Sequence, residues 1–276
     1  MRRLRFPSVL ALLFLLPADP AEAEDENHNY ASVIEVLEPD KKWVVVFRDK
    51  VWSCTADKTC EGIKERTLML TDRLYGPECR VVDLGAGTGR LTVPLAQRGR
   101  AVTAVEPSRR MLSVLEGRVE QANLTVQTEQ ARAQDFTPVP DCGLVIAVFT
   151  VMNYLLDEDA ILQLAGNVYA CLDPEGSFLF DLAMAGLFHS AHYQTHTMTR
   201  AIEISPLGGD RHRYKEHCEG VCDEAPFEYT DAFTIRQWDP GVVIPLLATE
   251  GLHLVEDHTR ELAGSGSHNL RVGRQP

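Results

Sequence analysis

A glycine-rich turn, DLGAGTGR at residues 83–90, directly follows a short apolar run. Glycines let a backbone approach a bound ligand closely, and a strand that ends in such a turn is typical of nucleotide and nucleoside sites. A dinucleotide fingerprint requires a further glycine five positions after Gly85, and that position holds Arg90. The turn therefore argues against a nucleotide-dependent oxidoreductase, while a plain tight turn without a ligand stays open.

Two acids follow the turn at places where a nucleoside could use them. Glu106 ends the next apolar run, about 21 residues after Gly85, where a carboxylate can accept hydrogen bonds from both ribose hydroxyls. Asp135 offers an acceptor for an exocyclic amine, and Phe136 beside it offers a ring for stacking. The alternatives are a helix N-terminal acid for Glu106 and an ordinary loop acid for Asp135.

Helical and strand patterns alternate around these residues, which predicts an α/β fold. We expect a Rossmann-like, doubly wound, mostly parallel sheet with helices on both faces. Pro107 and Ser108 are expected to open the helix after the second strand, and Asp157 the helix after the fourth. The expected helices span 63–77, 90–99, 108 onward and 157–172, and the expected strands span 80–84, 101–105, 124–127, 141–149 and 177–181.

Beyond residue 181 the pattern changes to strands joined by short turns, some of which must pair antiparallel. We expect an antiparallel, strand-rich insertion or lid near the C-terminus, and a closing hairpin at the edge of the main sheet. The predicted divisions are a signal peptide at 1–23, an N-terminal extension at 24–60, a cofactor-binding core at 61–181, the insertion at 182–240 and the hairpin at 241–276.

Four successive stretches, VVDLGAGTGRLTVPLA, VTAVEPSRRML, ARAQDF and LDPEGSFLFD, resemble the motifs of class I S-adenosylmethionine-dependent methyltransferases over about residues 60–181. The resemblance implies S-adenosylmethionine as cofactor, with Asp83, Gly85 and Gly87 near its methionine end and Glu106 on its ribose. Residues 149–154 would face the methyl-transfer site. The implied cofactor-binding residues are Asp83, Gly85, Ala86, Gly87, Glu106, Asp135, Phe136 and Phe149.

The resemblance implies methyl transfer to a nitrogen or oxygen of a small molecule. A neutral amine needs little beyond positioning, whereas an oxygen acceptor needs a base. No catalytic residue is assigned; the candidates are Asn153, Tyr154, His189 and His192, although each histidine could be an ordinary surface residue. The candidate acceptor-pocket residues are Tyr193, Arg236 and Trp238, with a structural ion pair packed beside an aromatic ring as the alternative.

Charge and motif content bear on the partners. The net charge of −13 would repel phosphates, and the stretch FTVMNYL lacks the prolines of nucleic-acid amino-group methylases, so we expect no nucleic acid partner. We likewise expect no membrane association of the mature chain. The oligomeric state stays open.

The first residues, three arginines before an apolar run too short to span a bilayer, are typical of a secretory signal peptide. The leader favours a secretory or periplasmic location, whereas the supply of the cofactor favours the cytoplasm. An uncleaved N-terminal extension is the alternative. The leader also motivates a second hypothesis, an exported binding or interaction domain that keeps the methyltransferase fold without catalysis.

The seven cysteines do not settle the compartment. Cys142 and Cys171 lie in apolar stretches and are expected to be core residues. Two pairs, Cys54 with Cys60 and Cys218 with Cys222, could close short loops in an exported protein. His217, Cys218 and Cys222 match no common zinc spacing, so we expect no metal site.

Overall fold

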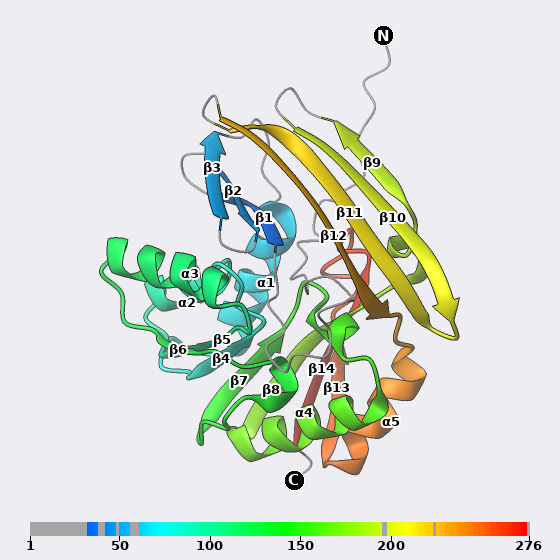
Figure 1. The fold of residues 1–276 in the computed structure, drawn as a ribbon. Helices are drawn as coiled ribbons and strands as arrows, with labels where there is room; N and C mark the ends of the chain where they lie inside the picture. The colour runs from blue at the N-terminus through cyan, green and yellow to red at the C-terminus, as the bar shows by residue number, and fades with distance from the viewer. Residues whose placement is uncertain are drawn as a thin grey trace.

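The computed structural model describes residues 32–37, 42–47, 50–55, 61–194, 198–222 and 225–274. Its centre is a seven-stranded sheet in the order β13-β14-β8-β7-β4-β5-β6 (Figure 1). The pairs from β8 to β6 are parallel, while β14 runs antiparallel to both β8 and β13. The strands are β4 (Val81–Leu84), β5 (Val102–Val105), β6 (Gln127–Glu129), β7 (Cys142–Ala147), β8 (Leu172–Ala183), β13 (Leu252–Asp257) and β14 (Ser267–Arg274).

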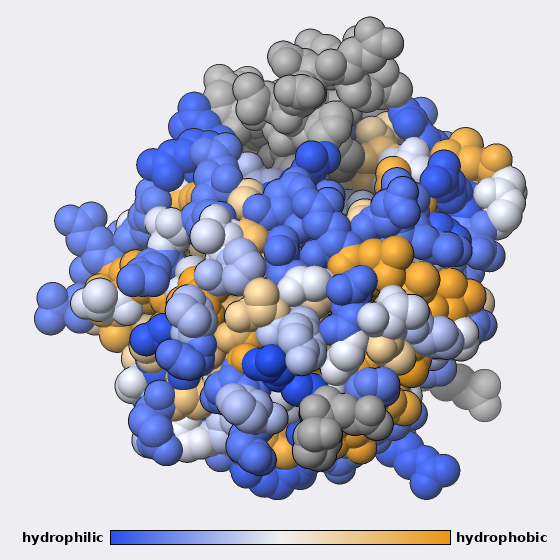
Figure 2. Space-filling view, turned by 90° about the horizontal axis from the view of Figure 1, so that it is seen from below, coloured by the Kyte–Doolittle hydropathy of each residue, from blue (hydrophilic) through white to orange (hydrophobic). Residues whose placement is uncertain are grey.

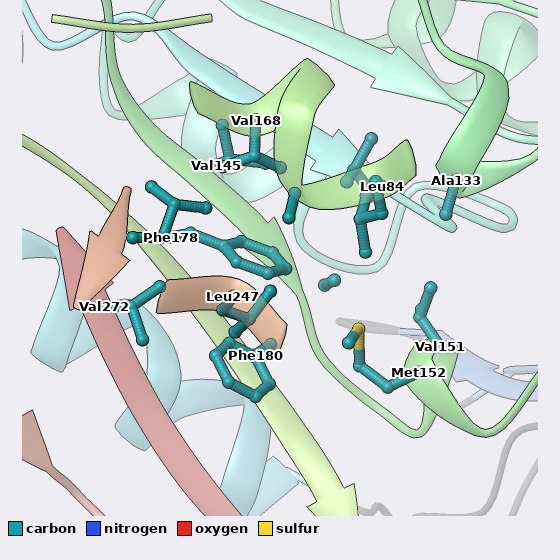
Figure 3. Close-up of a cluster of buried hydrophobic side chains, with 14 of the residues drawn as sticks. Leu84, Ala133, Val145, Val151, Met152, Val168, Phe178, Phe180, Leu247 and Val272 are labelled. Atoms are coloured by element: carbon teal, nitrogen blue, oxygen red, sulfur yellow. The ribbon is translucent and has the colours of Figure 1, made fainter. Parts of the chain in front are cut away.

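Helices cover both faces of this sheet because its buried strands carry apolar side chains on both sides. Val81 and Leu144 pack with residues of α1 (Glu61–Leu74) and α2 (Thr92–Gln97), whereas Val82 and Val145 pack with α4 (Glu158–Cys171) and α5 (Pro240–Thr249). Figure 3 shows the second cluster, in which Phe178, Phe180 and Leu247 lie close to one another. The predicted Rossmann-like, doubly wound fold is confirmed.

Side-chain caps begin the helices that position the site. Ser108 Oγ accepts the amide of Met111 at 3.3 Å and begins α3 (Arg109–Gln121). Asp157 Oδ1 accepts the amide of Ala160 at 2.9 Å and begins α4, as expected from an N-terminal Ser or Asp. Helix α5 was not predicted, because its sequence PGVVIPLLAT is apolar on all sides and contains two prolines. The third parallel strand, β6, begins three residues later than predicted.

A second sheet, β12-β11-β10-β9, stands between β8 and α5 in the chain and forms the antiparallel lid that was expected. Figure 1 shows it extending away from the main sheet as a separate layer. Its strands are β9 (Ala191–Gln194), β10 (Met198–Gly208), β11 (Arg211–Cys222) and β12 (Ala225–Arg236). The 24–60 region, read only as an extension, contains the antiparallel strands β1 (Ser32–Leu37), β2 (Lys42–Phe47) and β3 (Lys50–Thr55).

The surface is mixed in polarity. Figure 2 shows one face on which hydrophobic areas are interrupted by hydrophilic ones. Within the described ranges, no helix is long and apolar enough to cross a membrane. The large hydrophobic residues exposed there are Met69, Tyr169, Leu207, Val221, Val242, Leu254 and Val255.

Candidate functional site

The glycine turn leaves β4 at the carboxyl edge of the sheet with three left-handed residues. The φ angles are +68° at Gly85, +56° at Gly87 and +93° at Gly89, a conformation that side chains other than glycine rarely adopt. The amides of Gly85 and Ala86 both donate to the carbonyl of Val105, at 2.8 and 3.1 Å, which ties the turn to the end of β5. A Cβ atom at Gly87 would meet no atom within 4 Å, so this part of the turn borders open space.

Glu106 joins the turn to the start of α3. Its Oε2 accepts the amide of Gly87 at 2.9 Å and its Oε1 accepts the amide of Ser108 at 2.9 Å. The residue is 0% exposed, and burial raises the pKa of its carboxyl to about 8. The residue predicted to bind a ribose therefore lies directly beside the glycine predicted to meet the cofactor.

Two further carboxylates are buried on β4 and β8, strands of the main sheet that are separated by β7. Asp83, in β4, accepts the Thr92 hydroxyl at 2.6 Å, and burial raises its pKa to about 6. Asp181, in β8, accepts the amide of Thr150 at 2.8 Å, and burial raises its pKa to about 6 as well. Asp181 was not among the predicted site residues, although a polar residue that ends a buried apolar strand, as in SFLFD, was the available signal.

The segment after β7 is strained where it meets the turn. Phe149 and Thr150 are consecutive residues other than glycine with φ angles of +64° and +71°. Each such residue costs on the order of 1–3 kcal/mol, and such strain is concentrated at functional sites. The guanidinium of Arg90 lies 4.8 Å from the centre of the Phe149 ring, so the residue that replaces a fingerprint glycine contacts a predicted cofactor residue.

Asn153 and Tyr154, the candidate catalytic residues that follow, lie where the core meets the lid. The buried Asn153 donates its side-chain amide to the carbonyl of Arg236, at the end of β12, at 2.7 Å. The ring of Tyr154 stacks on Phe233 of the lid with 5.7 Å between the ring centres. The structure brings both residues to the site, and a catalytic role for either stays a prediction.

The prediction of an adenine platform at Phe136 is wrong. Phe136 is 1% exposed because it is packed inside the main hydrophobic cluster, and no face of its ring is free for a base. Asp135 is exposed, and its oxygens accept Nε of Arg132 at 2.7 Å and Nε2 of Gln163 at 3.0 Å. Asp135 thus links η2 (Ala133–Asp135) to α4 at the surface, and its contact with the cofactor stays a prediction.

The prediction of an acceptor pocket at Trp238 is also wrong. Trp238 is 3% exposed and donates Nε1 to the carbonyl of Leu155 at 2.8 Å. The guanidinium of Arg236 lies 3.7 Å from the Trp238 ring centre and also donates to the carbonyl of Leu156 at 3.3 Å. These contacts fasten the end of the lid to the core, although the ion pair expected as the alternative is not formed by Arg236 with any described residue.

The remaining lid candidates are two histidines and a tyrosine. His189 and His192 are exposed, as an ordinary surface histidine would be. The side chain of Tyr193 lies outside the described residues. In the part of the chain that the structure describes, no group of three or more His, Cys, Asp or Glu side chains is placed to hold a metal ion.

A buried charged network on the lid was missed by sequence reasoning. Glu216 of β11 is 1% exposed and accepts Arg200 Nη2 at 2.7 Å, the Tyr214 hydroxyl at 2.6 Å and the Tyr229 hydroxyl. The Arg200 guanidinium and the two hydroxyls lower the pKa of Glu216 against the opposing effect of burial. The residues of this network come from three different strands. Their proximity depends on how those strands are paired, which the sequence alone does not show.

The structure excludes one of the two disulfides that the sequence allowed. Cys218 is a buried free thiol on β11, the strand that also carries Cys222. Four residues along one strand span about 13 Å, well beyond the reach of a disulfide. The pairing of Cys218 with Cys222 is therefore wrong, and the pairing of Cys54 with Cys60 concerns side chains outside the described residues.

Known proteins share both the sequence motifs and the fold. Residues 81–176 match a family model described as a methyltransferase domain. A Geobacillus sp. (strain WCH70) protein named as a methyltransferase is 31% identical over 126 residues, which are 46% of this chain and 49% of that protein. A Bacillus subtilis (strain 168) relative is 30% identical over 37% of this chain and 42% of its own. The chain thus matches about half the length of these curated relatives.

Solved structures agree in fold. An S-adenosylmethionine-dependent methyltransferase from Clostridium acetobutylicum superposes with a TM-score of 0.70 at 16% identity, over 80% of this chain and 94% of that one. The sugar N-methyltransferase KedS8 from Streptoalloteichus sp. superposes with a TM-score of 0.64 at 17% identity, over 77% and 87%. Residues 81–176 thus match a methyltransferase domain, and the fold of the chain is similar to that of solved S-adenosylmethionine-dependent methyltransferases.

Proposed function

We propose that this protein transfers a methyl group from S-adenosylmethionine to a nitrogen atom of a small molecule, with an oxygen acceptor as the broader possibility. The observation that carries the proposal is the set of buried carboxylates, Asp83, Glu106 and Asp181, around a glycine turn that borders open space at Gly87. Carboxylates and open backbone at the carboxyl edge of a parallel sheet suit a nucleoside with hydroxyl donors and a positive charge.

The cofactor supplies an activated methyl group on a sulfonium, so the protein needs chiefly to bind, orient and exclude water. Gly87 leaves room for the cofactor, Glu106 accepts its ribose hydroxyls, and Asp83 provides negative charge near its methionine end. The lid, fastened to the core by Trp238 and Asn153, closes the acceptor side.

The preference for nitrogen rests on the histidines. An oxygen acceptor needs a base, but His189 and His192 are exposed, and no described histidine is hydrogen-bonded to Asp83, Glu106 or Asp181. A neutral amine acceptor needs no such base. Two fold neighbours support the choice, since KedS8 is a sugar N-methyltransferase and MtfA a glycopeptide N-methyltransferase.

The test is transfer of radiolabelled methyl from S-adenosylmethionine by the purified protein to matched pairs of amino sugars and their hydroxyl counterparts. We expect label in the amines, with little in the hydroxyl partners. Label in the hydroxyl compounds alone would overturn the choice of nitrogen. Cofactor binding without transfer to either series would favour the non-catalytic domain instead.

A further inference from the structure

Three thiols gather at the amino edge of the main sheet, the edge opposite the cofactor turn. Cys79 stands two residues before β4, Cys142 begins β7 and Cys171 ends α4. The carbonyl oxygen of Arg80 accepts both the Cys79 thiol, at 3.5 Å, and the Cys142 thiol, at 3.3 Å. The proposed methyl transfer uses none of these groups.

Two of the three thiols are adjacent and inaccessible to solvent. Cys142 is directly opposite Leu172 in the parallel register of β7 and β8, and Cys171 is the residue before Leu172. Cys142 and Cys171 are each 0% exposed, belong to the same core cluster and interact through their thiols. The Cys142 thiol also contacts the carbonyls of Arg80 and Leu144, and the Cys171 thiol that of Val139. A disulfide needs Cα atoms about 4.4–6.8 Å apart with side chains directed at each other, and the adjacent chain positions and the thiol contact favour that geometry.

We propose that Cys142 and Cys171 close to a disulfide when the chain folds in the presence of a thiol oxidant of the glutathione disulfide class. One cysteine thiolate attacks glutathione disulfide, forms a mixed disulfide and releases one glutathione thiolate. The other cysteine thiolate attacks the protein sulfur of that mixed disulfide and releases the second glutathione. Two cysteine thiols are oxidised, one glutathione disulfide is reduced to two glutathione thiols, and the two cysteine protons end on those glutathione thiols, with no net release of protons.

The structure also indicates when this bond can form. Burial raises the pKa of the Cys79 thiol to about 11, and burial together with the Cys171 contact raises the pKa of Cys142. The interaction with the Cys142 thiol lowers the pKa of the Cys171 thiol. Thiolate is scarce at Cys142 in the folded state, and no oxidant reaches the pair, so the bond forms during folding and only slowly afterwards.

The bond would join the end of α4 to the start of β7 and close a loop of about 30 residues. Such a cross-link restricts the unfolded chain, and for a protein of this size we expect the Tm to rise by about 5–15 °C. The pairing also differs from those that the sequence suggested, because it links two core residues that are remote in sequence.

The test is refolding of the denatured full chain with glutathione disulfide, in parallel with refolding under dithiothreitol. Tryptic mapping by mass spectrometry should find one linked peptide pair, Cys142 with Cys171, which is lighter by two hydrogens and is absent from the reduced sample. Incubation of already folded protein with the same oxidant should form the link many times more slowly. The Tm of the oxidised protein should exceed that of the reduced protein.

Single substitutions separate this pair from the other thiols. Cys171→Ser should abolish the link and the rise in Tm, whereas Cys79→Ser should keep both. Cys218→Ser is the matched control, a buried free cysteine in the lid. A Cys79–Cys142 link, or two unmodified thiols at Cys142 and Cys171 after oxidative refolding, would overturn the proposal. None of these readouts depends on cofactor binding or methyl transfer.

Discussion

The carboxyl edge of the main sheet and the lid both bury carboxylates, but they satisfy them in opposite ways. At the sheet edge, Asp83, Glu106 and Asp181 accept only backbone amides and a hydroxyl, and burial raises the pKa of each. In the lid, Glu216 is paired with Arg200 and its pKa is lowered. Within the described ranges, no ion pair neutralises the three sheet-edge acids.

This difference suggests a binding role for the carboxyl edge of the main sheet and a structural role for the Glu216 network of the lid. A buried carboxylate without a counter-charge costs stability, which a ligand with hydroxyl donors and a positive charge can restore. A buried carboxylate that already has a guanidinium and two hydroxyl partners gains little from a ligand. The contrast supports the proposed binding of the cofactor at the sheet edge, whereas the Glu216 network holds the lid strands in register.

The largest effect is expected when the lid pair is broken. Glu216→Gln removes the carboxylate that pairs with the buried Arg200 guanidinium, which should lower the free energy of unfolding by about 3–5 kcal/mol. Urea unfolding followed by circular dichroism measures this change. The double variant Arg200→Met/Glu216→Leu removes both charges and should recover most of the loss. If the two variants were equally unstable, the network would not behave as a charge pair.

A smaller and different effect is expected at the sheet edge. Glu106→Ala removes the acceptor for the ribose hydroxyls, which should weaken S-adenosylmethionine binding about 10- to 100-fold because hydrogen bonds to a charged group contribute about 1.5–3 kcal/mol. Glu129→Ala is the matched control, since Glu129 ends the next strand and bonds Thr137 instead of the glycine turn. Equal affinity losses in both variants, measured by calorimetry, would contradict a specific role for Glu106.

The two regions should also respond to pH with opposite signs. Glu106 has a folded pKa of about 8 against an ordinary 4.5, so its contribution to stability is complete below about pH 4.5 and is lost as the pH rises toward 8. Glu216, with a lowered pKa, contributes stability above pH 4.5 that is lost under acid.

Ligand-free stability should therefore fall between pH 5 and 8 by up to about 1 kcal/mol per pH unit from Glu106. Glu106→Gln should flatten this fall, and Glu216→Gln should leave it unchanged. Thermal unfolding scans across that range provide the measurement. A wild-type stability that does not fall between pH 5 and 8 would show that Glu106 is already ionised in the folded protein.

The smallest effect is expected at the joint between the two regions. Trp238→Phe keeps most of the buried ring but removes the donor to the carbonyl of Leu155, at a cost of about 1 kcal/mol. Thermal unfolding should detect a small decrease in Tm with cofactor affinity unchanged. A large loss of affinity would instead mean that Trp238 lies in the binding site.

The local motifs were predictable because neighbouring residues determine them. The turn at Gly85, the caps at Ser108 and Asp157 and the alternation of strands and helices depend on residues close in sequence. Glu106 could be placed beside the turn since consecutive parallel strands end at one edge of a sheet.

Contacts that depend on tertiary packing were not predictable in the same way. An aromatic residue beside an aspartate suggested a base-stacking pair, but Phe136 is directed into the core instead. Arg200 and Glu216 are 16 residues apart and meet only through the register of β10 and β11. Cys142 and Cys171 likewise become neighbours only because β7 and β8 pair in parallel.

The most direct test of the central claim is calorimetry of S-adenosylmethionine binding at pH 7, in two buffers with different ionisation enthalpies. If Glu106 is largely protonated when free and accepts ribose hydroxyls when bound, binding should release roughly one proton in the wild type and almost none in Glu106→Gln. NAD should not bind. Absence of S-adenosylmethionine binding, or binding with no proton release, would contradict the assignment of the buried sheet-edge carboxylates to the cofactor.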